Sequence, residues 1–222
     1  MTLGLTQQLG AFVAKIGAQG APAEVREAAK EGLIDAIGCM VAGSVDEAVL
    51  IALRALPVPQ GERSQLWFSK QTTSADHAAL LNGIAAHVLD YDDTCLRGHP
   101  SAILVPAIYA VAQELASSGQ QVLDAYIAGY EVWAELVDRE QDFHQMKGWH
   151  PTGIFGSIAA AASCAALYGL DAERSTWALG LGASQAGGLM SNFGAMSKSL
   201  HVGRAAQAGV VAAQLAAHGF TA

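Results

Sequence analysis

Apolar side chains recur at helical spacing along almost the whole chain, and this pattern constrains the fold more than any other feature. In one segment they advance by four, four, three and four residues and so line one helix face: Val122, Tyr126, Tyr130, Trp133 and Val137. Alternating runs of β-branched and aromatic residues are nearly absent, and the one plausible extended piece is Gln65–Ser69. The sequence therefore predicts an all-α fold, a multi-helix bundle forming a single domain over residues 1–222.

Residues that start and stop helices set the expected boundaries. Pro22 suits the first turn of a helix, Thr73-Ser-Ala-Asp76 resembles a capping box, and Asp171 is an expected N-cap. We expect loops at Asp138–His150 and Gly187–Ser199. Helices are expected over residues 3–17, 22–42, 46–55, 73–90, 102–117, 120–138, 153–168, 171–186 and 199–218. The later helices are rich in Ala and Gly, so we expect their axes to approach closely.

The composition excludes several classes of protein. Apolar residues make up 52% of the chain and charged residues 14%, which excludes intrinsic disorder and implies extensive burial. A net charge of −8 argues against general affinity for nucleic acid or anionic membranes. The charge-free stretches 175–197 and 205–222 consist largely of small residues and would be poor membrane spans, and residues 1–20 do not resemble a signal peptide. A soluble, cytoplasmic protein is expected.

The segment Leu89-Asp-Tyr-Asp-Asp-Thr94 places three carboxylates at an expected helix C-terminus. The helix dipole disfavours negative charge there, so a cationic group is expected nearby. Asp93 and Thr94 lie three and four residues after Asp90, so the three side chains would share one face if the helix continued through them. A solvated acidic helix end is the alternative interpretation.

Three further segments carry candidate side chains. His99 and His150 each precede a proline in a loop, where a surface or capping role is the alternative. Lys198, His201 and Arg204 are spaced by three around an expected helix start, where free N–H groups and the dipole attract an anion. The alternative for this last group is a cationic turn that pairs with acidic residues elsewhere.

Metal and nucleotide sites are not expected. The histidines lack common metal-ligand spacings, and His87-x-x-Asp90-x-Asp92 matches no known motif. The cysteines are too far apart in sequence for a CxxC-type site. Glycine-rich pieces such as Gly180-Leu-Gly182 lack a preceding strand and a phosphate-binding lysine.

Five segments, in order along most of the chain, resemble the MmgE/PrpD family: LDYDDT…HPSAILVPA (89–107), AYIAGYEVWAEL (125–136), GWHPTGIFGS (148–157), ALGLGASQAGGL (178–189) and KSLHVGRAAQAGVVAAQLAAHGF (198–220). Members include 2-methylcitrate dehydratase, cis-aconitate decarboxylase and iminodisuccinate epimerase, which act on di- or tricarboxylates without a cofactor. The resemblance implies a helical domain in a homodimer, with a smaller α+β lid domain that is absent from these 222 residues.

Carried over by motif, the resemblance implies active-site positions at Asp90, Thr94, His99, His150 and Lys198. Reactions of this class develop negative charge beside carboxylates, so they need cationic groups and a positioned acid or base. We assign carboxylate binding to Lys198 with His201 and Arg204, and proton transfer to His99 and His150. Asp90 and Thr94 are expected to orient these histidines and the substrate.

The leading hypothesis is a cofactor-independent lyase or isomerase that acts on a di- or tricarboxylate and most resembles 2-methylcitrate dehydratase. One alternative is a catalytically incomplete helical dimerisation module, or one component of a split enzyme. A helical binding protein for a small acid is a third possibility.

Overall fold

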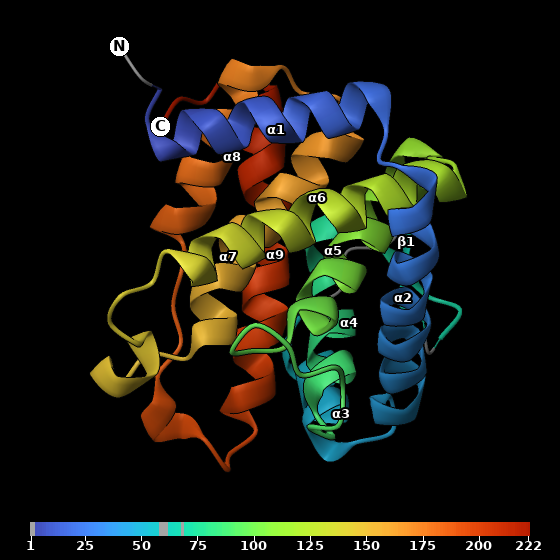
Figure 1. Cartoon of the computed structure of the whole chain (residues 1–222). Coiled ribbons are helices and arrows are strands. Elements are labelled where there is room, and N and C mark those ends of the chain that lie inside the picture. The colour runs from blue at the N-terminus through green and yellow to red at the C-terminus, as the bar shows by residue number, and fades with distance from the viewer. Residues whose placement is uncertain (1–2, 58–61, 68) are drawn as a thin grey trace.

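The computed structural model describes residues 3–57, 62–67 and 69–222, and within them the chain forms nine α-helices, two short 3₁₀ turns and a two-stranded sheet (Figure 1). This confirms the all-α fold. The helices are α1 (Leu5–Gln19), α2 (Ala23–Gly43), α3 (Glu47–Ala55), α4 (Ala75–His87), α5 (Pro100–Leu115), α6 (Gly119–Asp138), α7 (Pro151–Leu167), α8 (Ala172–Ser184) and α9 (Ser197–Ala217). The 3₁₀ turns, η1 (His144–Lys147) and η2 (Met190–Asn192), lie within the two expected loops.

The extended segment is shorter than expected. Strand β1 (Ser64–Gln65) pairs antiparallel with β2 (Thr72–Thr73), so the expected strand over Gln65–Ser69 is largely wrong. The reason is a turn, in which the Ser69 N–H donates to the Leu66 carbonyl at 2.9 Å and reverses the chain. Residue 68, inside the expected strand, lies outside the described residues.

Most helix ends fall within two or three residues of their expected positions. Asp171 caps α8 as expected, because its side chain accepts the Arg174 N–H at 2.8 Å. Helix α4 starts after Ser74 and ends at His87, so Asp90 lies beyond it with a left-handed backbone (φ +55°). Helix α9 begins at Ser197, two residues earlier than expected.

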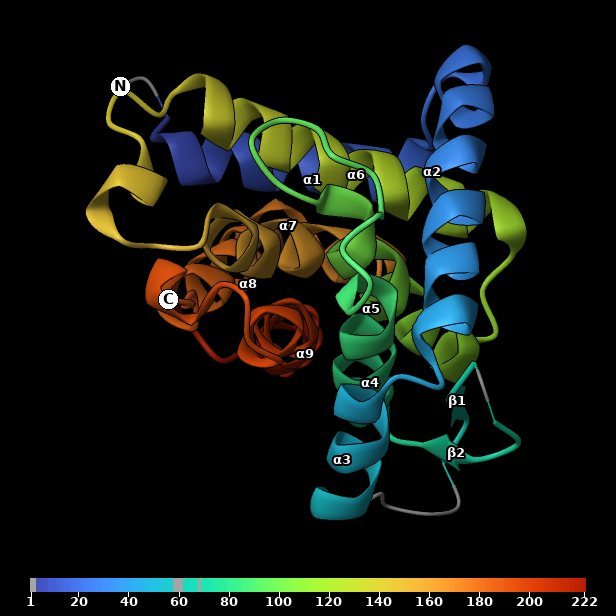
Figure 2. The same cartoon turned by 90° about the horizontal axis from the view of Figure 1, so that it is seen from below.

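Helix α9 packs most extensively against α7 and α4. Viewed from below, it is seen end-on beside α7 and α8, while α4 and α5 stand next to α2 (Figure 2). Helix α1 crosses the outside of α7 and α8. On α6 the expected apolar stripe is buried, with Trp133 completely enclosed and Tyr130 partly so.

Small residues allow the helices to approach very closely, as expected from the composition. A Cβ on Gly203 of α9 would lie 2.3 Å from the Leu80 carbonyl oxygen of α4. A Cβ on Gly83 of α4 would lie 2.8 Å from the Cα of Gly203, and one on Gly209 would lie 2.3 Å from the Cβ of Ala160 in α7. The backbones of α4 and α9 therefore touch, which fixes the spacing between the end of one helix and the start of the other.

Within the described part of the chain, no single helix is long and apolar enough to cross a membrane. Helices α2 and α3 pass this test only as a pair, on length and composition, and they are bent by 78° relative to each other.

Candidate active site

The acidic turn between α4 and α5 is held in a fixed path by its own side chains. Asp93 accepts the N–H of Ser101 at 3.2 Å and its hydroxyl at 2.8 Å, which ties the turn to the first residues of α5. Trp133 Nε1 donates to the Leu96 carbonyl at 3.0 Å. The carboxylate of Asp93 therefore stabilises the turn through Ser101. The carboxylates of Asp90 and Asp92 contact histidine and lysine side chains instead.

A second loop contact brings the start of α7 to the start of α9. The His150 N–H donates to the Gly188 carbonyl at 3.0 Å, and the Met190 N–H donates to the Gly148 carbonyl at 2.9 Å. Gly188 has a φ of +125°, and a Cβ there would lie 3.1 Å from the His201 ring and 3.2 Å from the His150 Cβ. Only glycine fits this position without strain, and its absence of a side chain lets the two histidines meet.

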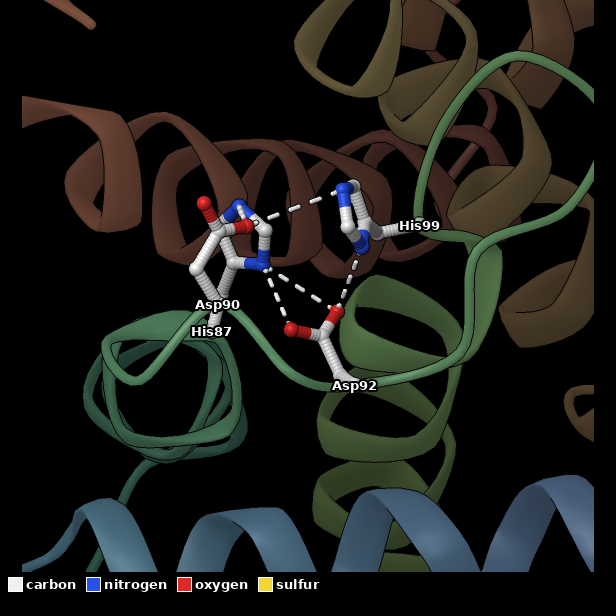
Figure 3. A group of neighbouring side chains, drawn as sticks. All are labelled: His87, Asp90, Asp92 and His99. Atoms are coloured by element: carbon white, nitrogen blue, oxygen red, sulfur yellow. Dashed lines mark hydrogen bonds and ion pairs between the residues drawn. The ribbon is translucent and has the colours of Figure 1, made fainter. Parts of the chain in front are cut away.

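Four side chains from the end of α4 and the acidic turn form a compact cluster (Figure 3). The fully buried carboxylate of Asp92 accepts a hydrogen bond from His87 Nδ1, at 2.9 Å to Oδ1 and 3.1 Å to Oδ2. Nδ1 of His99 lies 3.1 Å from Oδ2 of Asp92. The rings of His87 and His99 meet edge to face with centroids 4.5 Å apart. One buried carboxylate is thus shared between two imidazoles.

Lys198 of α9 completes this cluster from the other side. Its Nζ lies 2.5 Å from Oδ1 of Asp90, which is also 3.8 Å from His99 Nε2 and 3.9 Å from His87 Nε2. The cation expected beside the acidic segment is therefore confirmed. The Asp90 side chain is 54% exposed, whereas that of Lys198 is 16% exposed, so the ion pair forms the wall of an open site.

His150 and His201 extend the site along α7 and α9. Their Nδ1 atoms lie 3.2 Å apart, and the ring of Phe193 packs edge-on against His150 with centroids 4.7 Å apart. Lys198 Nζ lies 5.1 Å from the centre of the same Phe193 ring. Phe193 therefore contacts a candidate base and a candidate cation at once.

Burial and neighbouring charges shift the pKa values of Asp92, His99 and His150 in different directions. Burial alone would raise the pKa of Asp92, but the hydrogen bonds and charges of His87 and His99 outweigh it and lower that pKa to about 2. Burial would lower the pKa of His99, but the neighbouring Asp92 carboxylate more than compensates and raises it. Asp92 is therefore an anion, and His99 holds its proton more tightly than a free histidine.

The pKa of His150 moves the other way. Burial, followed by the charges of His201, His87 and Lys198, lowers it to about 3. Burial and the charge of His87 also lower the pKa of His201. His150 is consequently a neutral hydrogen-bonding group near neutral pH and a poor proton donor.

The structure brings together five of the seven residues singled out in the sequence: Asp90, His99, His150, Lys198 and His201. Thr94 is exposed in the turn, because the helix ends at His87 and Asp92 takes the inward position. Arg204 is exposed on α9 and donates to Gln207 at 2.5 Å. It lies outside the site because it is about two turns away from the helix start that carries Lys198.

Sequence reasoning missed His87 and Asp92 as members of the site. The available signal was weak: a histidine in the last turn of an acidic-ended helix, three residues before Asp90 and five before Asp92. Their meeting depends on the left-handed backbone of Asp90, which turns the chain back toward the helix end.

The donor atoms of His87, Asp90, Asp92 and His99 lie within 4.8 Å of one another, which is close enough to surround a metal ion. We do not assign these residues as metal ligands. The Lys198 ammonium already contacts Asp90 Oδ1, and its positive charge would repel a second cation at that oxygen. The donor set fits an ion-pair network better than a metal centre.

A cleft of about 360 Å³ opens beside the cluster. It lies between the start of α3, the end of α4 and the segment before α9, and it is lined in part by Asp46, Glu47, His87, Asp90, Met196 and Lys198. A larger hollow of about 660 Å³ lies between α2 and α5, but side chains such as Leu33, Ile37 and Trp67 line it and it offers little chemistry. We therefore take the smaller cleft as the candidate active site.

Fold and site together define an all-helical domain whose cleft is lined by one imidazole (His87), carboxylates and one lysine, with His99 next to it. The sequence model of the MmgE/PrpD N-terminal domain matches residues 7–222. The chain therefore belongs to the MmgE/PrpD family.

Curated relatives are 28–31% identical to the chain over the aligned residues. The chain is 31% identical to cis-aconitate decarboxylase of Homo sapiens over 86% of its own length and 42% of that protein. It is 30% identical to the cis-aconitate decarboxylase-like protein oryM of Aspergillus oryzae, over 97% of the chain and 47% of that protein. Cis-aconitate decarboxylase of Aspergillus terreus is 28% identical over 99% of the chain and 47% of that protein. The chain thus spans less than half the length of these relatives.

Proposed function

We propose that this chain provides the helical part of the active site of a cofactor-independent lyase that acts on a tricarboxylate, with cis-aconitate as the leading substrate. The observation that carries the proposal is the contact of Lys198 Nζ with Asp90 Oδ1 at 2.5 Å, with two imidazoles within 4 Å of the same oxygen. A substrate carboxylate that replaces the exposed Asp90 carboxylate would meet one ammonium and two imidazoles.

The relatives guide the choice of substrate. Sequence resemblance alone favoured a 2-methylcitrate dehydratase, but the relatives described above are named as cis-aconitate decarboxylases. Both reactions need the same features: a cationic pocket for carboxylates and a positioned acid or base that delivers or removes one proton. We therefore propose decarboxylation first and dehydration second.

The decarboxylation can be written with all atoms balanced. The bond between the CH₂ group of cis-aconitate and its carboxylate breaks and releases CO₂. The electron pair left behind forms a new terminal double bond, and the original double bond shifts its electrons to the CH carbon. That carbon takes one proton, which gives itaconate.

His99 is the proton donor that this scheme requires. The Asp92 carboxylate raises its pKa, so a larger fraction is protonated near neutral pH than for a free histidine. Its Nε2 lies on the side of Asp90, where the substrate carboxylate would bind. His150, kept neutral by burial, would instead hydrogen-bond the substrate or the developing enolate.

Incubation of the purified chain with cis-aconitate in D₂O, followed by ¹H NMR, tests the proposal. The expected product is itaconate with one deuterium in its CH₂ group beside the carboxylate, because one solvent proton is delivered there. A parallel incubation with 2-methylcitrate tests dehydration. If neither substrate is converted or bound, the proposed function fails.

We also propose that the chain forms a homodimer, which would cover part of its unusually apolar surface. Exposed side chains on and beside α2 include Ile34, at 70%, and Val45, at 78%. Sedimentation equilibrium measures the mass directly. A dimer that binds tricarboxylates without converting them would favour the alternative function of an incomplete module or one component of a split enzyme.

A further inference from the structure

His87 has one nitrogen that is fixed and one that is free. Nδ1 donates to both oxygens of Asp92, whose side chain has no exposed surface. Nε2 is buried and has no hydrogen-bond partner among the described residues. Burying a polar nitrogen without a partner is unfavourable, and such atoms in native proteins call for a ligand, a proton or a water.

The free nitrogen lies on the side of Asp90, a residue that lines the cleft. Asp90 Oδ1 lies 3.9 Å from Nε2, which is too far for a hydrogen bond, and His87 itself lines the cleft together with Lys198. An imidazole held by a buried carboxylate through one nitrogen, with the other nitrogen aimed at a reacting site, is the arrangement that enzymes use to position a proton-transferring histidine.

We propose that His87 is a further substrate-contacting residue, whose Nε2 takes up a proton and hydrogen-bonds a substrate carboxylate, and that Asp92 is its positioning residue. The inference rests on the proposed function and deepens it. With Nδ1–H directed at Asp92, neutral His87 offers only a lone pair at Nε2, so an incoming carboxylate needs a proton there before it can bind.

The charges around His87 support proton uptake on binding. The acidic turn supplies Asp90, Asp92 and His99, and α9 supplies Lys198 and His201. His150 lies just before α7, and Asp46 and Glu47 lie across the cleft at the start of α3. In the free protein Lys198 and Asp90 balance each other. A trianionic ligand adds negative charge close to the ring, which favours the imidazolium form of His87.

Isothermal titration calorimetry with tricarballylate, a saturated tricarboxylate that cannot be decarboxylated by this route, tests the proposal. Titrations in two buffers of different ionisation enthalpy give the number of protons taken up per ligand. His87→Gln keeps an N–H donor but cannot become a cation, so we expect it to lose most of the proton uptake and to weaken binding by roughly tenfold.

His77→Gln is the matched control. His77 lies on the same helix and also has a carboxylate partner, Asp76 Oδ2 at 3.2 Å, but it is remote from the cleft lining. It should leave both proton uptake and affinity unchanged. Circular dichroism verifies that both variants are folded.

The positioning role of Asp92 is tested separately, by the tautomer of His87. In the wild-type protein the ¹⁵N shifts of His87 should report the Nδ1–H tautomer, and Asp92→Asn should reduce that preference. A wild-type His87 in the Nε2–H tautomer overturns the proposal whether or not Asp92→Asn folds. Unchanged proton uptake and affinity in His87→Gln overturn this inference alone. A wild-type chain that binds no tricarboxylate overturns both this inference and the proposed function.

Discussion

The ammonium of Lys198 contacts the carboxylate of Asp90 at 2.5 Å, although the two residues are 108 positions apart in the chain. This ion pair joins the start of the last helix to the turn after α4, and it forms the wall of the cleft that we assign as the active site.

Lys198→Met should abolish most turnover of cis-aconitate. The ammonium is the strongest cation in the cluster, and removal of one group that stabilises developing negative charge typically costs about 10²–10³ in kcat. Lys30→Met is the control, since Lys30 is exposed on α2 and, among the residues that the structure describes, its one ion pair is with Glu27. Steady-state kinetics on both variants decide the matter. Equal rates for the two variants would contradict the assignment of Lys198.

Acid should destabilise the fold through His150. The pKa of His150 is lowered to about 3 from an ordinary 6.5. Between pH 6.5 and 3, His150 is therefore protonated in the unfolded chain and neutral in the folded chain. Stability should therefore fall as pH drops from about 6.5 to 3, by about 1.4 kcal/mol per pH unit from this group. The carboxylate of Asp92, with a pKa of about 2, adds a further loss only below about pH 4.

Urea unfolding at several pH values between 7 and 4 measures this slope. In His150→Gln the slope should be smaller over the same range, because the titrating group is gone. His99 acts in the opposite sense, since its raised pKa adds stability that is fully present below pH 6.5 and is lost as the pH rises above its own pKa.

Gly203→Ala should destabilise the protein by about 1–3 kcal/mol, because its methyl group would overlap the Leu80 carbonyl and force α4 and α9 apart. Gly38→Ala is the matched control. Gly38 also lies inside a helix, has open space where its Cβ would be, and should gain about 0.5–1 kcal/mol from helix propensity. Thermal unfolding of the two variants should move in opposite directions.

Chelation should have no effect on the folded protein or on its turnover. The Lys198 contact with Asp90 makes the cluster unfavourable for a second cation. Dialysis against EDTA, followed by thermal unfolding and a turnover assay, checks this expectation. Loss of activity that zinc or magnesium restores would instead indicate a metal at His87, Asp90, Asp92 and His99.

Much of the fold could be predicted because it depends on local sequence. The periodicity of α6 and the cap at Asp171 act within a few residues, so they specify a helix wherever the chain places it. The strand at Gln65–Ser69 was expected to be longer because β propensity does not register the turn that reverses the chain at Leu66.

The site was harder to predict because its geometry depends on contacts between distant segments. Lys198 and His99 carry types of chemistry that sequence reasoning recognises, and the structure places both beside Asp90. Thr94 and Asp92 are two residues apart, and which of them faces inward depends on where α4 ends. The sequence signals a helix end only to within a few residues.

The two residues of the ion pair, Asp90 and Lys198, lie far apart in the chain, which matters during synthesis and folding. The acidic turn is synthesised long before Lys198, which lies on the last helix, and the two meet only when α9 packs against α4. Until then the clustered negative charges of Asp90, Asp92 and Asp93 lack their lysine counterion and repel one another. The packing of α9 against α4 thus buries apolar side chains of both helices and brings the lysine counterion to the acidic turn.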